Sequence, residues 1–301
     1  NYAREMIARG HEVTVFTKSF FHAEFREYLD EDEKTRLEFI DGIRTVWLRS
    51  MHYHSNGWRR AVGEVQFAYR AVKYAKRLGD KPDVIIADSV SPINGLAGVI
   101  VARKMASAFV YQLRDIWPIS QVHNGTLKKN SLPYIIFRLM EKYIYRHADW
   151  VCSALPLVHH HVEKGGGAAN RITYIRNGVD LSPYDRLQAS SNVLEQSGAE
   201  TISVMYVGTI AAAHDVISIV CAAFILQKAQ DLRFKFIIYG EGVKKEACMH
   251  EAVKHDLKNI EFRGMIDKSK VPNALQEADI LIASVLASDT YKFGINLNKL
   301  Y

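Results

Sequence analysis

The chain has 301 residues, of which 48% are hydrophobic and 24% charged; these are the proportions of an ordinary globular protein, and the length suffices for two domains. No run of about 18 apolar residues occurs, so the sequence predicts no membrane-spanning helix. The formal net charge of +6 suits nucleic acid, anionic lipid or a phosphorylated substrate, and charge alone does not decide among them. The three cysteines are too few and too widely spaced for a disulfide framework or a metal site, which fits a reducing cytoplasm.

Helix-like and strand-like segments alternate from the beginning of the chain, a pattern typical of α/β layers. The opening segment 1–10 has the pattern of an amphipathic helix, and further helices are predicted at 65–78, after a turn at 88–92, and at 132–147. The predicted strands of this part are 11–17, 43–49, 82–87, 108–113, 150–153 and 171–175.

Residues 184–200 are polar and lack periodicity, which indicates a linker between a first domain at 1–183 and a second at 201–301. The alternation of strands and helices resumes after this linker. The predicted strands of the second domain are 202–207, 235–239, 260–262 and 280–284, and its predicted helices are 216–229 and 244–255.

Each domain is expected to be Rossmann-like and to lack a part. A doubly wound domain normally opens with a strand and a glycine-containing turn, whereas this chain begins inside a helix pattern. At the other end, 299–301 have the pattern of the first turn of a helix. The expected fold is therefore α/β, with two Rossmann-like domains truncated at both ends.

Two glycine-containing turns follow predicted strands of the second domain. Gly208 and Thr209 follow the first strand, and Gly240 and Glu241 follow the second. Glycine at such a place lets the backbone approach a phosphate, and the next helix N-terminus supplies N–H donors. Either turn taken alone is equally well interpreted as a tight connection between strand and helix.

The segment 293–300 follows the last predicted strand and leads into a helix start. It combines Gly294 and Asn298 with Lys299. At a helix N-terminus these residues would form a diphosphate cradle in which the lysine adds a positive charge. The alternative interpretation is a solvated lysine at a helix start.

A charged pair, Arg114 and Asp115, follows the predicted strand 108–113 and precedes a Trp-Pro dipeptide. Charged residues at a strand end favour a ligand-facing loop. The structural alternative is a surface pair of these two residues, with Trp117 packed underneath.

Three other motifs are interpreted as structural. Asp30-Glu31-Asp32 has the Asp-x-Asp spacing of metal-dependent transferases, but it stands in a run of charges with no strand before it, so a solvated helix face is the preferred interpretation. The consecutive histidines at 159–161 cannot share one helix face as metal ligands do. Gly165-Gly166-Gly167 precedes a strand and is interpreted as a flexible turn.

Taken in this order, the segments resemble the GT-B glycosyltransferases of family 4, and the resemblance extends over nearly the whole chain. The two motifs RDIWP and GINLNKLY look most like the branch of fucosamine and N-acetylhexosamine transferases of bacterial surface-polysaccharide synthesis. The motifs that carry the resemblance are ARGHEVTVFT at 8–17, LRDIWP at 113–118, IRNGVD at 175–180, VMYVGTI at 204–210, YGEG at 239–242, IEFRG at 260–264, EADILIAS at 277–284 and YKFGINLNKLY at 291–301.

The resemblance implies that the second domain binds a nucleotide sugar and that the first domain binds the acceptor. By position, the first glycine turn would face the donor diphosphate, the Arg263 strand end would lie near the base, and Lys299 would cap the diphosphate. The donor-binding residues implied in this way are Gly208, Thr209, His214, Gly240, Glu241, Arg263, Gly264, Gly294, Asn298 and Lys299.

The sequence departs from the family pattern at several positions. Relatives carry an acidic pair seven residues apart near the end of the donor domain; here the second member would fall just past Tyr301, and Gly294 stands near the first. The Arg and Lys that many relatives have after the first strand of that domain are missing, and the stretch offers only His214. An N-domain histidine is replaced by Arg114.

The reaction implied by the resemblance is sugar transfer from a nucleotide diphosphate, a UDP-sugar, with retention at the anomeric carbon. Negative charge builds on the leaving oxygen, where prearranged hydrogen-bond donors lower the barrier. Helix N-termini and a lysine would supply these donors, so neither a metal nor another cofactor is expected. The predicted catalytic residues are Arg114, Asp115 and Lys299.

The predicted helix at 132–147 suggests how a lipid-linked glycan acceptor would be reached. It mixes aromatic and basic residues, as does a helix that lies on an anionic bilayer. The expected location is therefore cytoplasmic and peripheral on the inner face of the cell membrane. An amphipathic core helix with a solvated basic edge is an equally good interpretation. The basic residues concerned are Lys128, Lys129, Arg138, Lys142 and Arg146.

Three rival functions follow from other features. A GT-B sugar-nucleotide epimerase has the same architecture but needs titratable acid and base residues, and the sequence offers no place for them. A nucleic-acid-binding protein is discounted, because the basic residues are spread through the chain rather than gathered in one strip with aromatic residues. The third possibility is an incomplete pair of domains without activity.

Overall fold

The computed structural model describes residues 2–21, 26–53, 57–178, 201–287 and 289–295. The chain divides into two compact units. The first comprises Asn1–Arg176 and Lys292–Gly294, and the second comprises Asn177–Tyr291 and Ile295–Tyr301. The sequence did not predict that Lys292–Gly294 would belong with the first unit.

The first unit contains two sheets in which most neighbouring strands are parallel, as expected for α/β layers. One sheet has the order β1-β5-β4, with β4 antiparallel to β5, and the other has the parallel order β6-β7-β8-β9. A two-stranded ladder, β2-β3, follows β1. The strands are β1 (Thr14–Lys18), β2 (Phe20–Phe21), β3 (Arg26–Glu27), β4 (Thr35–Ile40), β5 (Ile43–Leu48), β6 (Val84–Asp88), β7 (Ala108–Leu113), β8 (Trp150–Ser153) and β9 (Ile172–Tyr174).

Two helices of the first unit begin where the sequence provides a serine cap. Ser91 and Ser131 each accept a hydrogen bond from an N–H in the first turn of the helix that follows, and a proline stands in each of these first turns. The helices are α1 (Tyr2–Ala8), α2 (Trp58–Leu78), α3 (Pro92–Met105), α4 (Ile119–His123), α5 (Leu132–His147) and α6 (His159–Lys164), with the 3-10 turn η1 (Ala169–Arg171). The 3-10 turn η4 (Tyr291–Phe293) belongs to this unit from Lys292 on.

The core of the first unit lies around the parallel sheet of β6 to β9. Phe109 and Tyr111 of β7 pack in this core with Val99 of α3 and Ile144 of α5. Helix α3 lies close to the sheet because it carries glycine: a Cβ at Gly98 would lie 2.5 Å from a ring carbon of Phe109. Phe293 joins this core and is 8% exposed, which explains why its segment belongs to the first unit.

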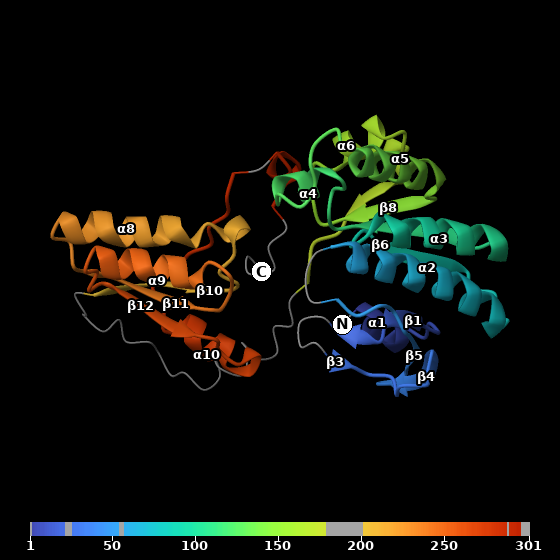
Figure 1. The fold of residues 1–301 in the computed structure, drawn as a ribbon, viewed down its shortest axis with the longest axis horizontal. Helices are drawn as coiled ribbons and strands as arrows, with labels where there is room; N and C mark the ends of the chain where they lie inside the picture. Colours follow the sequence, from blue (N-terminus) through green and yellow to red (C-terminus); the bar gives the residue numbers. More distant parts are fainter. Residues whose placement is uncertain (1, 22–25, 54–56, 179–200, 288, 296–301) are drawn as a thin grey trace. The chain divides into compact units, whose positions relative to one another are not determined.

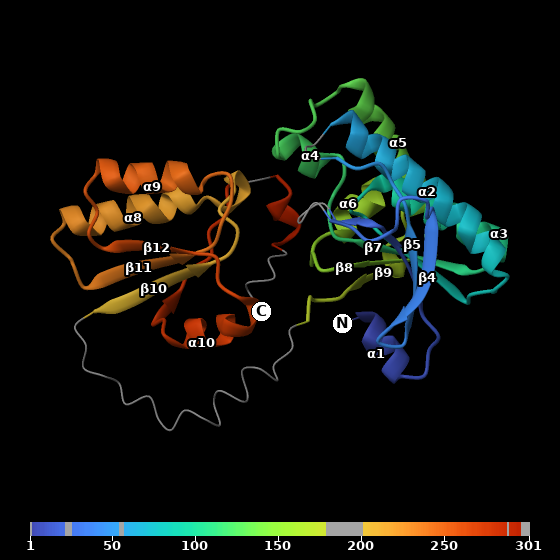
Figure 2. The same cartoon turned by 60° about the horizontal axis from the view of Figure 1, so that its bottom comes forward.

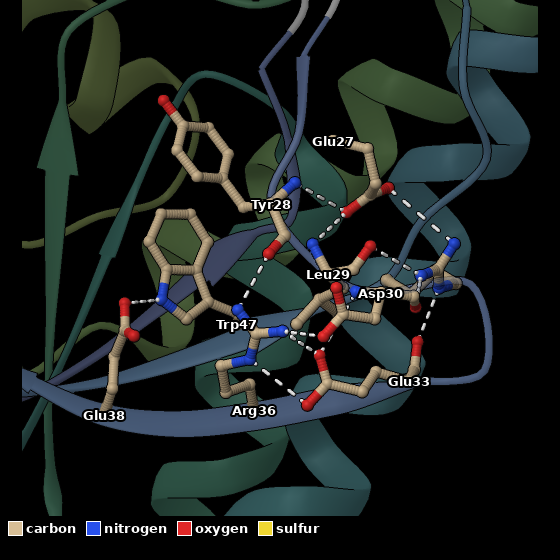
Figure 3. A network of polar contacts seen from close by, with 9 residues as sticks. Glu27, Tyr28, Leu29, Asp30, Glu33, Arg36, Glu38 and Trp47 are labelled. Carbon is tan, nitrogen blue, oxygen red and sulfur yellow. Dashed lines mark hydrogen bonds and ion pairs between the residues drawn. The ribbon is translucent and has the colours of Figure 1, made fainter.

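The acidic segment at 30–33 does not form the helix expected from the sequence; it is a turn between β3 and β4. Asp30 Oδ2 lies 2.8 Å from Arg36 Nη2, and Glu33 Oε1 accepts a hydrogen bond from Arg36 Nε at 3.1 Å. Arg36 Nη1 also donates to the carbonyl oxygen of Tyr28 at 2.9 Å (Figure 3). The helix interpretation is wrong because 35–40 pair with β5 along their whole length, and the carboxylates bind the arginine of that strand.

The second unit is a parallel sheet with the order β12-β11-β10-β13. Helices α8 and α9 cover one face of the sheet and α10 covers the other (Figures 1 and 2). The predicted elements are present, although the last strand has two residues where five were expected. The elements are β10 (Ile202–Val207), α8 (Val216–Lys228), β11 (Phe234–Tyr239), α9 (Lys245–Lys254), β12 (Ile260–Gly264), α10 (Val271–Gln276) and β13 (Ile280–Leu281), with 3-10 turns η2 (Ala212–His214) and η3 (Lys268–Lys270).

Candidate functional site

The carboxyl ends of β10, β11 and β12 meet at one edge of the second unit. The N–H of Gly208 donates to the carbonyl of Tyr239 at 3.0 Å, and the N–H of Gly240 donates to the carbonyl of Gly264 at 2.7 Å. The structure therefore brings together the glycines predicted to bind a donor from three separate strand ends. In open α/β sheets this edge is where ligands bind.

Gly240 and Gly242 are required by the close approach of two loops. Their φ values are +147° and +151°, a backbone region that other residues rarely adopt. A Cβ at Gly240 would lie 1.9 Å from the carbonyl oxygen of Gly208, and one at Gly242 would lie 2.4 Å from that of Ile210. The loops after β10 and β11 thus pack backbone against backbone, while the side chains of Thr209 and Glu241 are exposed.

A lysine that the sequence interpretation missed lies beside Glu241. Lys245, at the start of α9, places Nζ 2.5 Å from Glu241 Oε1. The signal for this contact is the spacing of four residues between Glu241, in the loop, and Lys245, the first residue of α9. An anion bound at this edge would compete with Glu241 for the Lys245 ammonium.

Arg263 is held rigidly at the end of β12. Its Nε lies 2.9 Å from Glu261 Oε1, and its Nη1 donates to the hydroxyl of Tyr239 at 2.9 Å. The guanidinium also lies 5.5 Å from the centre of the Tyr239 ring. The hydrogen bonds that Arg263 donates to Glu261 and Tyr239 raise its pKa above the ordinary value, so the residue presents a permanent charge and a planar group that can stack on a ring.

His214 lies in η2, which is tied to the segment after β13. The hydroxyl of Ser284 donates to the carbonyl of His214 at 2.6 Å, and the N–H of Leu286 donates to the carbonyl of Ala213 at 3.0 Å. These bonds fix the backbone of the turn between β10 and α8. His214 therefore belongs to the same strand-end region as the glycines of β10.

In the first unit, Arg114 and Asp115 follow β7 as the sequence predicted. The hydroxyl oxygen of Ser89, which is fully buried, accepts hydrogen bonds from the N–H groups of Arg114 at 2.7 Å and Asp115 at 2.8 Å. The packed tryptophan of the alternative interpretation is also present, since the Trp117 ring lies 5.1 Å from that of Phe137.

The carboxyl group of Asp115 is crowded by protein although the residue keeps an exposed surface. Burial raises the pKa of Asp115 above its ordinary value; Arg114 opposes this shift and Asp88 adds to it. Asp88 ends the neighbouring parallel strand β6, so both carboxylates stand at the same sheet edge. A carboxylate with a raised pKa is a better proton acceptor, which suits a group that handles a hydroxyl proton.

The remaining predicted donor residues are Gly294, Asn298 and Lys299. Gly294 belongs to the first unit, where a Cβ would lie 2.4 Å from Pro156 Cδ. The preceding Phe293 accepts a hydrogen bond from the N–H of Leu157 at 2.9 Å. Asn298 and Lys299 lie outside the described residues.

The described residues show neither a candidate metal site nor a candidate membrane-spanning helix. They contain no group of three or more His, Cys, Asp or Glu side chains placed to hold a metal ion. Among the described helices, none combines the length and the apolar character needed to cross a bilayer.

Two family models match the chain. Residues 1–178 match the Glycosyl transferase 4-like domain, and residues 201–299 match Glycosyl transferases group 1. The boundaries of these two matches fall on either side of the predicted linker. No curated protein sequence is significantly similar to this chain.

Solved structures show the same fold at low sequence identity. HepE from Anabaena, in complex with UDP and glucose, is 15% identical with a TM-score of 0.54; the match covers 82% of this chain and 62% of HepE. Sucrose-phosphate synthase from Thermosynechococcus elongatus is 16% identical with a TM-score of 0.64, covering 95% and 69%. The catalytic domain of starch synthase IV from Arabidopsis thaliana, bound to ADP and acarbose, is 11% identical with a TM-score of 0.62, covering 95% and 73%. The chain thus spans less than two thirds of HepE, and the predicted α/β fold with two Rossmann-like domains is confirmed.

Proposed function

Because the chain belongs to the glycosyl transferase 4-like family, we propose that it transfers a sugar from a nucleotide diphosphate to an acceptor, with retention at the anomeric carbon. The observation that carries this proposal is the meeting of the Gly208, Gly240 and Gly264 strand ends at one edge. The N–H groups of Gly208 and Gly240 bind carbonyls within the sheet, so the proposed diphosphate donors are other main-chain N–H groups of these loops and of the start of α9.

The proposed donor is a UDP-sugar, supported by HepE, whose structure holds UDP and glucose. Arg263 and Tyr239 form a flat, charged surface for the base, and Lys245 supplies charge to the diphosphate by leaving Glu241. Lys245 would thereby replace the basic residues that the sequence lacks after β10. Asn298 and Lys299 remain proposed diphosphate ligands on the family resemblance alone.

The chemistry follows from these assignments. The bond between the anomeric carbon and the diphosphate oxygen breaks, and the charge on the leaving oxygen is stabilised by N–H groups and lysine without a metal. The oxygen of the acceptor hydroxyl forms the new bond to the anomeric carbon, and the hydroxyl proton is transferred to a basic oxygen. Asp115 of the first unit is the proposed group that orients this hydroxyl, because its raised pKa makes its carboxylate more basic than that of an ordinary aspartate.

The proposed acceptor is a glycan or lipid-linked saccharide of a bacterial surface polysaccharide, reached at the inner face of the cell membrane. Exposed apolar side chains recur on α5 at three- and four-residue spacing, so they form one stripe. The basic residues beside this stripe give it the character of a helix that binds anionic lipid. The apolar residues of the stripe are Leu132, Ile135, Ile136, Leu139 and Tyr143.

The decisive experiment for the enzymatic proposal is nucleotide binding followed by transfer. UDP should raise the melting temperature of the chain, because a ligand that binds only the folded state stabilises it. Transfer from UDP-sugars labelled in the sugar then tests the reaction. Absence of any nucleotide effect on melting would remove the proposal.

A further inference from the structure

A histidine outside both sites described above is held by a carboxylate and is open to solvent. His52 follows β5 by four residues, and its Nε2 lies 2.6 Å from Glu27 Oε2 of β3. The side chain of Glu27 is 18% exposed, whereas that of His52 is 46% exposed. The imidazole is thus accessible to a ligand, while the carboxylate is largely covered by protein.

Glu27 is fixed as an ionised hydrogen-bond acceptor. Its Oε1 accepts the N–H groups of Tyr28 at 3.0 Å and Leu29 at 2.9 Å (Figure 3), and Arg49 Nη1 lies 4.0 Å from its Oε2. Burial raises the pKa of Glu27, but hydrogen bonds from Leu29 and other donors, together with the charge of Arg49, outweigh burial and hold the pKa below its ordinary value. An ionised carboxylate accepts hydrogen bonds and donates none.

The carboxylate selects one form of the neutral imidazole. Because Glu27 only accepts, the proton of neutral His52 lies on Nε2 and the lone pair lies on Nδ1. The ring plane is fixed as well, since the ring stacks on buried Phe20 with centroids 4.5 Å apart and 19° between the planes. Among the described residues, no hydrogen bond to Nδ1 is present. His52 therefore offers solvent a prearranged hydrogen-bond acceptor, which suits a hydroxyl group.

The carboxyl ends of β5 and β6 lie on one side of the first unit. Glu64, in the second turn of α2, pairs with Lys18 at the end of β1, so the helix begins on that side. Asp80, just past the end of α2, pairs with Arg44 near the start of β5, so the helix ends on the opposite side. Strand β6 then runs back, and the serine that follows it binds the N–H of Asp115. The histidine after β5 and Asp115 therefore share the proposed acceptor side.

Two arginines of α2 add positive charge near this histidine. Arg70 donates to the carbonyl of the residue after β5. Burial raises the pKa of Tyr53, and the charge of Arg60 opposes this shift, so Arg60 lies close to the residue next to His52. These guanidinium groups attract an anion, but at His52 an anion would meet the lone pair of Nδ1 and the carboxylate of Glu27. The arginines suit an acceptor that carries an anionic group, while the histidine suits a hydroxyl.

We propose that His52 binds a hydroxyl group of the acceptor saccharide and that Glu27 is its positioning residue. The hydroxyl donates to Nδ1, and Glu27 keeps the proton of the ring on Nε2. In the proposed reaction Asp115 orients the reacting hydroxyl, and His52 holds another hydroxyl of the same saccharide. This inference rests on the proposed function, because that function makes the first unit the acceptor side.

Long-range proton–nitrogen NMR spectra of the full chain with isotope-labelled histidine test the proposal without donor or turnover. The two ring nitrogens give separate signals, which show the nitrogen that carries the proton. At about pH 8, where an ordinary histidine is neutral, His52 should carry its proton on Nε2. The probes are the methyl glycosides of glucose, galactose and N-acetylglucosamine, and at least one should shift the Nδ1 signal. The loss of signals in His52→Gln assigns them.

Three variants separate binding from positioning. In Glu27→Gln the amide can donate to Nε2, so the ring should populate the form with its proton on Nδ1, and affinity for the glycoside should fall about tenfold, the loss expected for one hydrogen bond. His52→Asn, whose side-chain oxygen replaces Nδ1, should bind the glycoside more tightly than His52→Gln, which lacks an acceptor there. Thermal melts report folding, and the two variants of the exposed histidine decide the matter if Glu27→Gln fails to fold.

His147 is the matched control in the same spectra. Its Nδ1 lies 2.6 Å from the carbonyl oxygen of Tyr143 in α5, so it should carry its proton on Nδ1, and glycosides should leave its signals unchanged. The proposal is overturned if His52 carries its proton on Nδ1, if no glycoside shifts its signals, if His147 shifts equally, or if inorganic phosphate shifts His52 in place of the glycosides.

Melting with UDP distinguishes failure of this proposal from failure of the proposed function. Stabilisation by UDP without a glycoside response removes the role of His52 alone. A glycoside response at His52 without a UDP effect removes the donor assignment alone.

Discussion

The buried hydroxyl of Ser89 accepts the main-chain N–H of Asp115 at 2.8 Å. The same oxygen accepts the N–H of Arg114, so one side chain from the end of β6 holds the backbone of both charged residues after β7. The loop that carries the proposed acceptor-side residues is thereby set by the neighbouring strand rather than by its own sequence.

Ser89→Ala should therefore reduce both the transfer rate and the stability of the fold. Removal of the hydroxyl leaves two N–H groups without their acceptor and costs about 1–3 kcal/mol of unfolding free energy. Displacement of Asp115 should in addition slow transfer by on the order of a hundredfold, since small misplacements at a reacting centre are costly. Urea melts and single-turnover rates give the two quantities. Ser120→Ala, which removes a helix hydroxyl bound to the carbonyl of Ile116, is the control and should leave the rate unchanged.

Asp115→Asn should stabilise the fold at neutral pH while it lowers the transfer rate. Burial raises the pKa of Asp115 in the folded chain, so its ionised form weakens the folded state at pH values above the ordinary carboxyl pKa. This penalty disappears as the pH falls through the folded pKa towards the ordinary value, and the stability gain of the variant should disappear with it. Melting temperatures of both proteins from acid to neutral pH measure the effect. A variant that is less stable than the parent at neutral pH would contradict the assignment.

UDP should raise the melting temperature more than GDP or ADP does. Arg263 and Tyr239 form the flat surface proposed to hold the base, and uracil is the base proposed from the HepE comparison. Arg263→Ala should reduce the UDP effect, with Arg233→Ala as the control for an arginine that pairs with Asp231 away from this edge. Equal shifts for all three nucleotides would remove the base preference.

Phe293→Ala should destabilise the first unit. The ring is 8% exposed, lies 5.5 Å from the ring of His161, and packs in the core of that unit. Truncation of a buried phenylalanine typically costs about 3–5 kcal/mol. Phe39→Ala, at a position that is 70% exposed, should change stability by less than about 1 kcal/mol. Equal melting curves for both variants would place Phe293 outside the core.

Binding to anionic vesicles should depend on α5. Replacement of Ile135 and Leu139 by Gln removes two exposed apolar side chains from the stripe, and replacement of Lys128, Lys129, Arg138 and Lys142 by Gln removes charge. Either set should weaken co-sedimentation with vesicles that contain phosphatidylglycerol, and salt should weaken it further through screening. Replacement of Ile225 of α8, which is 64% exposed, is the control. Binding that survives both sets of changes would exclude α5 as the membrane-binding helix.

The sequence predicted the parallel units well because strand and helix periodicities are local. The strands at 108–113, 150–153 and 202–207 and the helix at 132–147 have the predicted boundaries. The sequence interpretation missed β4, because the run of charged residues there was assigned to a helix face. This strand pairs with β5. A high density of charged residues indicates that a segment is exposed to solvent. It does not distinguish an exposed antiparallel strand from an exposed helix face.

The sequence predicted the glycines of the candidate site, but it did not predict the contacts between side chains around them. Gly208 and Gly240 stand next to strand ends in the sequence itself. The contact of Lys245 with Glu241 needs the helix start to be known. The ion pair of Lys18 and Glu64 joins residues 46 positions apart, and the packing of Phe293 on His161 joins residues that no local pattern relates.

The backbone contact between the loops after β10 and β11 has a practical consequence for changing donor preference. Because the carbonyls of Gly208 and Ile210 fill the space where side chains at Gly240 and Gly242 would go, substitution at these glycines would force the two loops apart together. Libraries aimed at a new donor would therefore keep the glycines fixed and vary Thr209 and Glu241, whose exposed side chains can change in size and charge while the loop backbone stays in place.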